Sequence, residues 1–404
     1  MAYLLDNPVR DYAWGSPTVI PDLLGRPATG EPQAELWLGA HGAAPSLVRT
    51  ESGLLTLPDL VARDPERMLG PAVVARFGAR LPFLLKVLAV ERPLSIQVHP
   101  TTTQAEEGYA AEDAAGVPLA APDRSYRDPF HKPEVVVALS DFEALAGFRE
   151  PSETAALIAT LDLPALGDVE RMLTEPGGLA GATRWMLEFE PVLPLVDEVV
   201  QACTRRAGSE PFGTVARIAA DHPGDRGVLL ALLLDLVRLR PGQACAVPAG
   251  TPHAYLRGVV VEAQASSDNT LRAGLTPKHV DAPEVLRTLR YEPAPHLRLV
   301  PRAIDGVAEY GMADVAEFRL SRVRLGAPPT VLTGSGPAIL LVTEGQATLT
   351  AGTRLALARG ASAFVPADCE RVELAGDGTA FVVTTAVEPT RYGKMTIAWT
   401  TSGG

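Results

Sequence analysis

The chain has 404 residues, of which 47% are hydrophobic and 21% charged, and its formal net charge is −12. This composition can bury a substantial core, and the length favours two or three domains. The negative charge disfavours a nucleic-acid partner, because phosphate backbones are bound by basic surfaces. It does not exclude an anionic substrate held in a locally positive pocket.

The sequence shows no targeting or membrane-spanning signal. Residues 1–8 have no basic segment that leads into an apolar one, so we expect no signal peptide. No run of about 18 apolar residues occurs, so we expect no transmembrane helix and no membrane partner. The three cysteines, Cys203, Cys245 and Cys369, are far apart and odd in number, which predicts neither disulfides nor a thiolate metal site. These features favour a reducing cytoplasm.

Two aromatic clusters occur early in the chain, at 12–16 and 34–41, and hold two of the four tryptophans. Trp14 could pack in a core, or it could form a pocket wall that offers a polyol a flat apolar face and an N–H. The apolar stretch 81–90 then predicts a buried strand, and a turn at 91–93 predicts a hairpin with the strand that follows.

That following stretch, 94–100, carries the first signal of a site. Read as a strand, it alternates sides, so Ser95, Gln97 and His99 share one face while the apolar residues between them face the core. Buried polar groups need partners, so this polar row predicts the floor of a site rather than part of a core.

Helical periodicity replaces strand signals in the middle of the chain. We predict a helical insert at 150–238 that separates two parts of one β domain, 1–149 and 239–300. From 301 to 404, many short strands punctuated by Gly, Pro and Asp predict a second β domain.

A short internal echo links the two β regions. The stretch 240–250 resembles 358–368, and both contain Val-Pro-Ala after a turn. When the two copies are aligned on that tripeptide, His253 falls opposite Arg371, so the later copy keeps the turn and lacks the imidazole. The echo predicts two related β-barrels, of which only one carries a metal.

Four side chains could together hold that metal: Gln97, His99, Glu134 and His253. Two imidazoles, a carboxylate and an amide oxygen suit Zn²⁺, or alternatively Fe²⁺ or Mn²⁺. A lone histidine is more often a hydrogen-bonded structural residue, and only the combination favours a metal. Tyr255, two residues after His253, would face the same way.

A second group of residues is basic. The stretch 266–279 has almost no apolar period, and its Arg272 and Lys278, together with Lys132, could bind an anionic group such as phosphate. The alternative is a solvated loop with ordinary surface charges. The histidines without obvious metal partners are expected to be structural or exposed; they are His41, His222, His279 and His296.

Six stretches of the sequence resemble motifs of the type I mannose-6-phosphate isomerases. In chain order they are 12–16, 34–41, 95–100, 131–134, 248–255 and 267–278. The resemblance implies a mainly β fold of two cupin-type, jelly-roll-like barrels with a helical domain. It implies one Zn²⁺ per chain on the residues at Gln97, His99, Glu134 and His253, and a monomer.

The same resemblance implies interconversion of mannose 6-phosphate and fructose 6-phosphate, with Arg272 as a catalytic residue and Lys132 in the active site. Such an isomerisation moves a proton between two carbons through a cis-enediol and needs a base. Glu262 is our first candidate, because its apolar neighbours would desolvate the carboxylate and raise its pKa. The alternative bases are Lys132, Tyr255 and His99. An ion pair of Glu262 with a nearby base such as Arg272 is the structural alternative.

We expect Ser95, Lys278, Trp14 and Asp268 to contact the substrate. Two other functions compete with the isomerase: a sugar-phosphate-binding cupin without catalysis, and a metal-dependent cupin oxygenase. The expected ligand set with its basic residues argues against the first. The glutamine ligand argues against the second, because oxygenases need open coordination positions for O₂.

Overall fold

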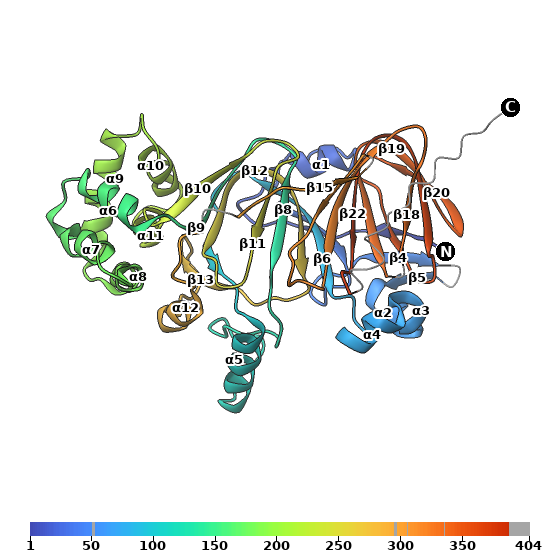
Figure 1. Ribbon diagram of the computed structural model, residues 1–404, viewed down its shortest axis with the longest axis horizontal. Coiled ribbons are helices and arrows are strands. Elements are labelled where there is room, and N and C mark those ends of the chain that lie inside the picture. The colour runs from blue at the N-terminus through green and yellow to red at the C-terminus, as the bar shows by residue number, and fades with distance from the viewer. Residues whose placement is uncertain (51–52, 295–296, 305, 335, 388–404) are drawn as a thin grey trace.

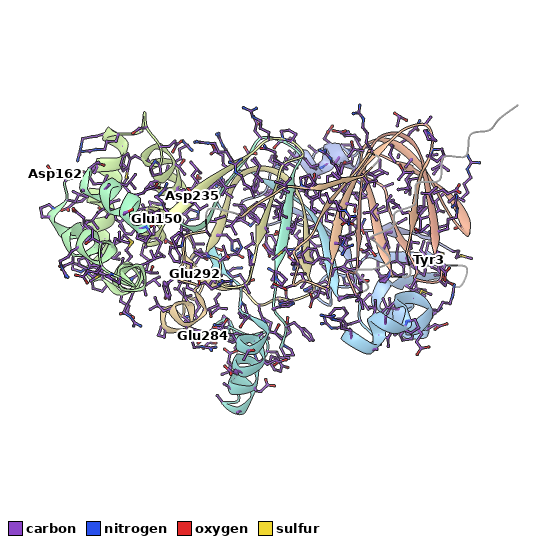
Figure 2. The ribbon with its side chains drawn as sticks, viewed as in Figure 1. Tyr3, Glu150, Asp162, Asp235, Glu284 and Glu292 are labelled. Atoms are coloured by element: carbon purple, nitrogen blue, oxygen red, sulfur yellow. The ribbon has the colours of Figure 1, made fainter. Side chains whose placement is uncertain are left out.

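In the computed structural model, two β-sheets lie side by side along the long axis and a helical region forms one end (Figure 1). The structure describes residues 1–50, 53–294, 297–304, 306–334 and 336–387. Side chains fill the space between the ribbons of the two sheets (Figure 2). The predicted mainly β fold with a helical insert is confirmed.

Each sheet has 11 strands. Sheet I consists of β2 (Val9–Arg10), β3 (Glu35–Gly39), β6 (Phe83–Val90), β7 (Ile96–Val98), β8 (Glu134–Ala138), β9 (Phe142–Phe148), β10 (Leu234–Leu239), β11 (Ala244–Val247), β12 (His253–Ala265), β13 (Leu271–Gly274) and β14 (Arg298–Leu299). Sheet II consists of β1 (Tyr3–Asp6), β4 (Leu47–Thr50), β5 (Gly53–Thr56), β15 (Arg302–Ile304), β16 (Val307–Tyr310), β17 (Arg319–Leu325), β18 (Thr330–Thr333), β19 (Ala338–Ala351), β20 (Thr353–Ala358), β21 (Ser362–Val365) and β22 (Arg371–Thr384). Among the described residues, the main path of strand pairing in each sheet is open, so the expected barrels are not closed by hydrogen bonds.

The long strand β12 organises sheet I. Its first residue, His253, pairs with Gln97 on β7, while its second half runs antiparallel to β6 and places Glu262 opposite Lys86. β7 pairs with β12 and β13 and not with β6, so the predicted hairpin of these two strands is wrong. Because β6 and β7 pair with different parts of β12, both contribute residues to the same site.

Strand β6 is buried along its whole length because sheet I packs on sheet II. Leu85 and Val87 face a core shared with Ile339 and Phe364 of sheet II. The intervening residues face the other way, and this places Lys86 on the inner face of sheet I. A strand that is buried on both faces has a nearly continuous run of apolar residues, and β6 shows such a run in its sequence.

Twelve α-helices and one 3₁₀ helix are present among the described residues. They are α1 (Val19–Leu23), α2 (Leu57–Arg63), α3 (Pro65–Leu69), α4 (Pro71–Phe77), α5 (Thr102–Ala114), α6 (Pro151–Ala159), η1 (Pro164–Leu166), α7 (Gly167–Leu173), α8 (Gly178–Glu188), α9 (Val192–Arg205), α10 (Phe212–Asp221), α11 (Gly227–Ala231) and α12 (Ala282–Thr288). The run from α6 to α11 forms the helical end of the molecule (Figure 1). None of the described helices is long and apolar enough to cross a membrane.

Helical amphipathicity explains why this end of the molecule has its own core. In α9 the buried residues include Leu195, Val196, Val199 and Cys203, which lie on one stripe of a 3.6-residue repeat. That stripe belongs to a core cluster that also contains Leu271 of β13. The helical region is therefore packed directly on the strand that carries Arg272.

The first strands of the chain lie in the sheet of the last ones. β1 pairs with β21 on one side and with β4 on the other, so residues 3–5 lie in register with residues 362–364. The division of the chain into domains at 149, 238 and 300 stays a prediction, and its last domain includes residues 388–404, which lie outside the described part.

Candidate active site

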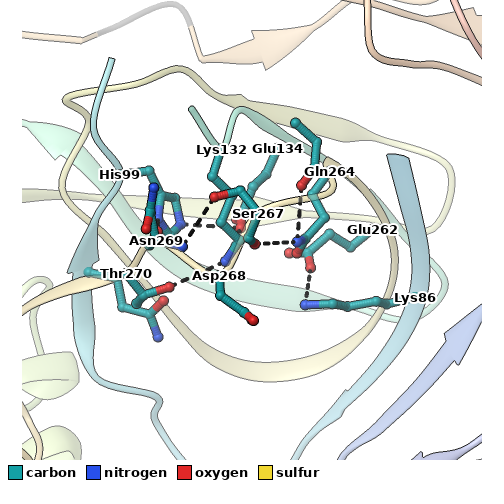
Figure 3. Close-up of polar contacts among 12 residues, drawn as sticks. Lys86, His99, Lys132, Glu134, Glu262, Gln264, Ser267, Asp268, Asn269 and Thr270 are labelled. Atoms are coloured by element: carbon teal, nitrogen blue, oxygen red, sulfur yellow. Dashed lines mark hydrogen bonds and ion pairs between the residues drawn. The ribbon is translucent and has the colours of Figure 1, made fainter. Parts of the chain in front are cut away.

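A pocket with a volume of about 520 Å³ opens on the inner face of sheet I. Eleven of the twelve residues expected to form a site line it; they are Trp14, Ser95, Gln97, Lys132, Glu134, His253, Tyr255, Glu262, Asp268, Arg272 and Lys278. The twelfth, His99, is fully buried behind the pocket wall and points toward the same centre. Figure 3 shows part of this network, with Lys86 and Glu262 on one side and His99 and Glu134 on the other.

Three of the predicted metal ligands meet at one point. One ligand atom from each of His99, Glu134 and His253 lies within 4.8 Å of the others. The Glu134 carboxylate lies between the two rings, with Oε1 3.2 Å from His99 Nε2 and Oε2 3.7 Å from His253 Nε2. All three side chains are buried.

Backbone carbonyls orient both imidazoles. His99 Nδ1 contacts the Asn269 carbonyl oxygen at 2.8 Å, and His253 Nδ1 contacts the Thr251 carbonyl oxygen at 3.0 Å. Each Nδ1 must therefore carry the proton and donate it, which leaves both Nε2 lone pairs directed at the centre. Burial lowers the pKa of His99 to about 4 and also lowers that of His253, so both rings are neutral at pH 7.

This geometry fits a metal ion better than a set of hydrogen bonds. His99 Nε2 is buried and makes no hydrogen bond, despite its short distance to the Glu134 carboxylate. Two neutral imidazoles and a carboxylate are the donors that Zn²⁺ accepts. Gln97 lies opposite His253 in the strand register, and its Nε2 donates to Ser95 Oγ at 3.0 Å. Its part as a fourth ligand stays a prediction.

Asn269 holds the loop behind the metal cluster and was missed by sequence reasoning. It is fully buried, and its Nδ2 donates to the carbonyl oxygens of Asp128 and Phe130. Its Oδ1 accepts the Arg127 N–H at 2.7 Å. Asn269 thereby ties the stretch before Glu134 to the carbonyl that orients His99. An asparagine in a polar stretch carries no sequence signal of such a role.

Lys86 is the second residue that sequence reasoning missed. Its Nζ lies 3.5 Å from Glu35 Oε2 and 3.3 Å from Glu262 Oε2, and all three side chains are buried. Burial would lower the pKa of Lys86, but the two carboxylates outweigh it and raise that pKa above its usual value. One lysine within eight otherwise apolar strand residues was the available signal.

Glu262 is connected to Glu134 through the hydroxyl of Tyr255. The Tyr255 hydroxyl lies 3.1 Å from both Glu134 Oε2 and Glu262 Oε1. A hydroxyl has one proton and can donate to only one of them, so a proton on Glu262 would complete the chain. Burial and the nearby Glu134 charge raise the pKa of Glu262 to about 7. Glu262 does form the ion pair that was the structural alternative, but its partner is Lys86 and not Arg272.

Lys86 and Glu262 affect each other's pKa. Two buried carboxylates raise the pKa of Lys86, and Glu35 contributes more to this than Glu262 does. Burial and the Glu134 charge raise the pKa of Glu262, and Lys86 opposes that rise.

Two cations line the pocket without a carboxylate partner: among the described residues, neither Arg272 nor Lys278 forms an ion pair. Burial lowers the pKa of both, and each is further lowered by a neighbouring guanidinium, Arg127 for the first and Arg272 for the second. Lys132, by contrast, is paired with Glu134 at 3.1 Å. The pocket therefore has two cations that suit an anion.

Two aromatic residues and the end of helix α10 also line the pocket. Tyr12 and Trp14 stack with ring centroids 5.9 Å apart, and Asp221 of α10 lines the pocket as well. Such a flat aromatic face can cover a sugar ring, with polar groups at its rim.

Two histidines that showed no partner in the sequence also line the pocket. His41 Nε2 lies 3.2 Å from Asp268 Oδ1; burial would raise the pKa of Asp268, but the hydrogen bond from His41 outweighs it and lowers that pKa. His222 lines the pocket from the helical region. His279 is exposed, and His296 lies outside the described residues.

Comparison with known proteins places the chain in a family. A family model described as "Phosphomannose isomerase type I, catalytic domain" matches residues 3–151, and one described as "Mannose-6-phosphate isomerase, cupin domain" matches residues 312–385. Mannose-6-phosphate isomerase of Escherichia coli (strain K12) is 40% identical over 93% of this chain and 97% of its own length. The chain belongs to the mannose-6-phosphate isomerase family. The family predicted from the sequence motifs is thus confirmed.

More distant relatives and solved structures agree. The mouse (Mus musculus) mannose-6-phosphate isomerase is 31% identical over 89% of this chain and 92% of its own length. A crystal structure of a phosphomannose isomerase variant from Salmonella typhimurium is 38% identical, covers 95% of this chain and 99% of its own, and has a TM-score of 0.90. A structure of the Salmonella typhimurium mannose 6-phosphate isomerase bound to substrate (fructose 6-phosphate) and zinc has a TM-score of 0.87 at 37% identity, with the same coverage.

Proposed function

We propose that this chain is a zinc-dependent aldose–ketose isomerase that interconverts mannose 6-phosphate and fructose 6-phosphate. The observation that carries the proposal is the shared pocket, in which a metal-ligand cluster, a buried carboxylate and two unpaired cations face one cavity. The family supports the same reaction, because relatives along nearly the whole chain are named for it.

One zinc ion per chain would be held by His99, Glu134 and His253, with Gln97 as the fourth ligand. When bound, the ion supplies a Lewis acid that polarises a substrate oxygen near the carbons that react. The buried, unpartnered Nε2 of His99 and the fixed tautomers of both rings support a metal ion at this position. The choice of Zn²⁺ over Fe²⁺ or Mn²⁺ rests on the type of donor atoms.

Glu262 is the base of the proposed reaction. It takes the proton from C2 of the aldose, or from C1 of the ketose, and returns it to the neighbouring carbon through a cis-enediol. A carboxylate with a pKa of about 7 can both accept and release a proton at neutral pH. Lys86 holds one oxygen of this carboxylate at 3.3 Å and the Tyr255 hydroxyl holds the other at 3.1 Å, which orients the carboxylate in the pocket lining.

The neighbours of Glu262 complete the proton path. Tyr255 bridges it to Glu134 and can pass a proton between them without moving far. Lys132, paired with Glu134 and 3.4 Å from Thr270 Oγ1, lies beside the pocket as a donor for a substrate oxygen. We place Lys132 and Tyr255 in supporting roles, because both lie in hydrogen-bonded networks that Glu262 completes.

The two cations contact different parts of the substrate. Arg272 stabilises the negative charge of the enediolate, and Lys278 and Ser95 contact the phosphate. Trp14 covers the sugar, and Asp268, held by His41, accepts a sugar hydroxyl. These contacts orient the substrate so that its first two carbons lie near Glu262.

A coupled assay on mannose 6-phosphate, with and without a chelator, tests the function. We expect turnover that is lost on metal removal and restored by added zinc. Turnover that does not depend on metal would contradict the proposed ligands. No turnover with sugar phosphate still bound would favour a binding cupin, and consumption of O₂ would favour an oxygenase. We further expect a cytoplasmic monomer that binds no nucleic acid.

A further inference from the structure

One carboxylate links the helical region to the loop that carries Lys278. Asp225 lies between α10 and α11 and accepts three backbone N–H groups. Its Oδ1 accepts from Gly227 and Leu275, each at 2.7 Å, and its Oδ2 accepts from Thr276 at 2.9 Å. Two of these three donors belong to the loop that follows β13. The mechanism proposed above uses neither Asp225 nor these hydrogen bonds.

The backbone that Asp225 holds has an unusual conformation. Leu275 has a φ of +56°, in the left-handed region that a residue with a β-carbon rarely adopts. Only one other described residue that is not glycine has a positive φ. Such a conformation persists only when its surroundings impose it, and here the amides of Leu275 and Thr276 both turn toward Asp225.

The helical region also touches this loop backbone to backbone. A β-carbon added to Gly227 would lie 2.6 Å from the Leu275 nitrogen, and one added to Gly274 would lie 2.5 Å from the Gly227 α-carbon. Real β-carbons do not approach other atoms so closely, so both positions need glycine for this approach. The two segments therefore dock in one arrangement only.

The loop held in this way carries Lys278, one of the two cations of the pocket. Leu275, Thr276 and Lys278 line the pocket, and the Lys278 N–H donates to Thr276 Oγ1 at 3.1 Å. Asp225 itself does not line the pocket and forms no ion pair with Arg272 or Lys278 among the described residues. Backbone N–H donors stabilise the Asp225 charge, so Asp225 fixes the loop without neutralising the cations of the pocket.

We propose that Asp225 is a positioning residue for substrate phosphate: it imposes the loop conformation that aims Lys278 at the anion. This inference rests on the proposed function for the identity of the substrate. What it predicts directly is the affinity of the pocket for an anion. It gives the helical region a role at the pocket, because loss of one contact from that region should weaken anion binding while the metal cluster stays intact.

Asp225→Asn tests the proposal, because the amide keeps the shape and loses one acceptor oxygen and the charge. We expect KM for mannose 6-phosphate to rise roughly tenfold or more, with kcat changed less than about threefold and the zinc content unchanged. Asp281→Asn is the matched control: Asp281 caps α12 by accepting the Glu284 N–H at 3.1 Å, so its loss should lower Tm and leave KM unchanged.

A second pair of variants perturbs the same contact from the helical side. Gly227→Ala should raise KM as Asp225→Asn does, because the new methyl group pushes the loop away. Gly167→Ala, in α7 of the same region, has open space around it and should leave KM unchanged. An unchanged KM in both test variants, or an equal rise in the controls, would overturn the proposal.

Equilibrium binding of inorganic phosphate to the zinc-loaded protein separates this inference from the proposed reaction. If the parent binds phosphate and both test variants bind it about tenfold more weakly, the positioning role stands even when mannose 6-phosphate is not turned over. If the parent turns over mannose 6-phosphate and the variants bind phosphate as tightly as the parent, the reaction stands and the positioning role is wrong.

Discussion

Sheets I and II share a strand framework and differ in what it carries. In each, a short strand (β11 or β21) leads through a Val-Pro-Ala turn into a long strand (β12 or β22). The first residue of β12 is the buried His253, whereas the first residue of β22 is the exposed Arg371, which pairs with Glu373 at 2.7 Å. Among the residues that the structure describes, the one three-residue ligand cluster lies in sheet I.

The contrast continues along the two long strands. Counted from those first residues, Glu262 occupies the position that Ala380 has in β22, and their strand partners are Lys86 and Val342. A buried acid–base pair in sheet I thus corresponds to a buried apolar pair in sheet II. The same backbone supports either packing or chemistry, and a few inward side chains decide which.

The largest effect should come from giving sheet I the residue of sheet II at the start of the long strand. His253→Arg removes a ligand and adds a charge beside the cluster, so we expect zinc binding to be lost and turnover to fall about 10⁴-fold or more. Metal analysis and the coupled assay measure both. Stoichiometric zinc in this variant would show that His253 is not a ligand.

Removing the charge of the base comes next. Glu262→Gln keeps the shape of the side chain and its distance from Tyr255, and we expect kcat to fall by about 10²–10⁴ while the zinc content stays unchanged. Glu143→Gln is a suitable control, since that carboxylate lies outside the pocket lining in a cluster with Arg238 and Arg257. A kcat close to that of the parent would remove Glu262 from the mechanism.

Converting the acid–base pair to the apolar pair of sheet II should separate stability from activity. Lys86→Val alone leaves Glu35 and Glu262 buried without their cation and should lower the free energy of unfolding by roughly 3–5 kcal/mol. The double variant Lys86→Val/Glu262→Ala should lose less stability, because it no longer buries Glu262 without its cation, and it should be inactive for lack of the base. Urea unfolding of both metal-loaded variants makes the comparison. A double variant that is less stable than the single one would show that the unpaired Glu262 carboxylate does not cause the loss.

The pH profile offers a smaller and more graded test. Burial raises the pKa of Glu262 to about 7, so the base is protonated below that pH and free above it. We therefore expect kcat/KM to rise about tenfold per pH unit below pH 7 and to level off above it. The rise should disappear in Glu262→Gln, whose residual activity should not follow this limb. An identical acid limb in that variant would assign the titration to another group.

The smallest effect should come from the reverse exchange. Arg371→His gives sheet II the imidazole that its copy of the turn lacks, but no ligand cluster surrounds that position among the described residues. We expect zinc content to remain at one per chain and kcat/KM to be unchanged. A second zinc per chain would show that sheet II retains more of a site than its described side chains indicate.

The sequence predicted much of the site because each signal was local. The i, i+2 spacing of Gln97 and His99 on a strand, and His253 directly after a tight turn, follow from local geometry alone. The buried, raised-pKa carboxylate of Glu262 could be inferred from its apolar neighbours. These features require no knowledge of which strands pair.

Features of the fold and site that depend on long-range contacts were missed or predicted wrongly. Lys86 looked like a residue of an ordinary buried strand, and its role emerged only from its register opposite Glu262. The expected hairpin failed because β7 pairs with β12 and β13, which are far from it in sequence. The use of Asn269 as a clamp depends on contacts across 142 residues, since it accepts from Arg127. No local pattern encodes such contacts.

The pairing of β1 with β21 has a consequence for synthesis on the ribosome. The first strand of the chain pairs early with β4, but it acquires its second sheet neighbour, β21, only when residues 362–364 have been made. At about 5–20 residues per second, that interval is roughly 20–70 s. During this time β1 and its neighbours β4 and β5 remain an unfinished sheet edge, open to pairing with other nascent chains. A chain that stops before β21 would keep this edge of β1 exposed permanently and prone to aggregation.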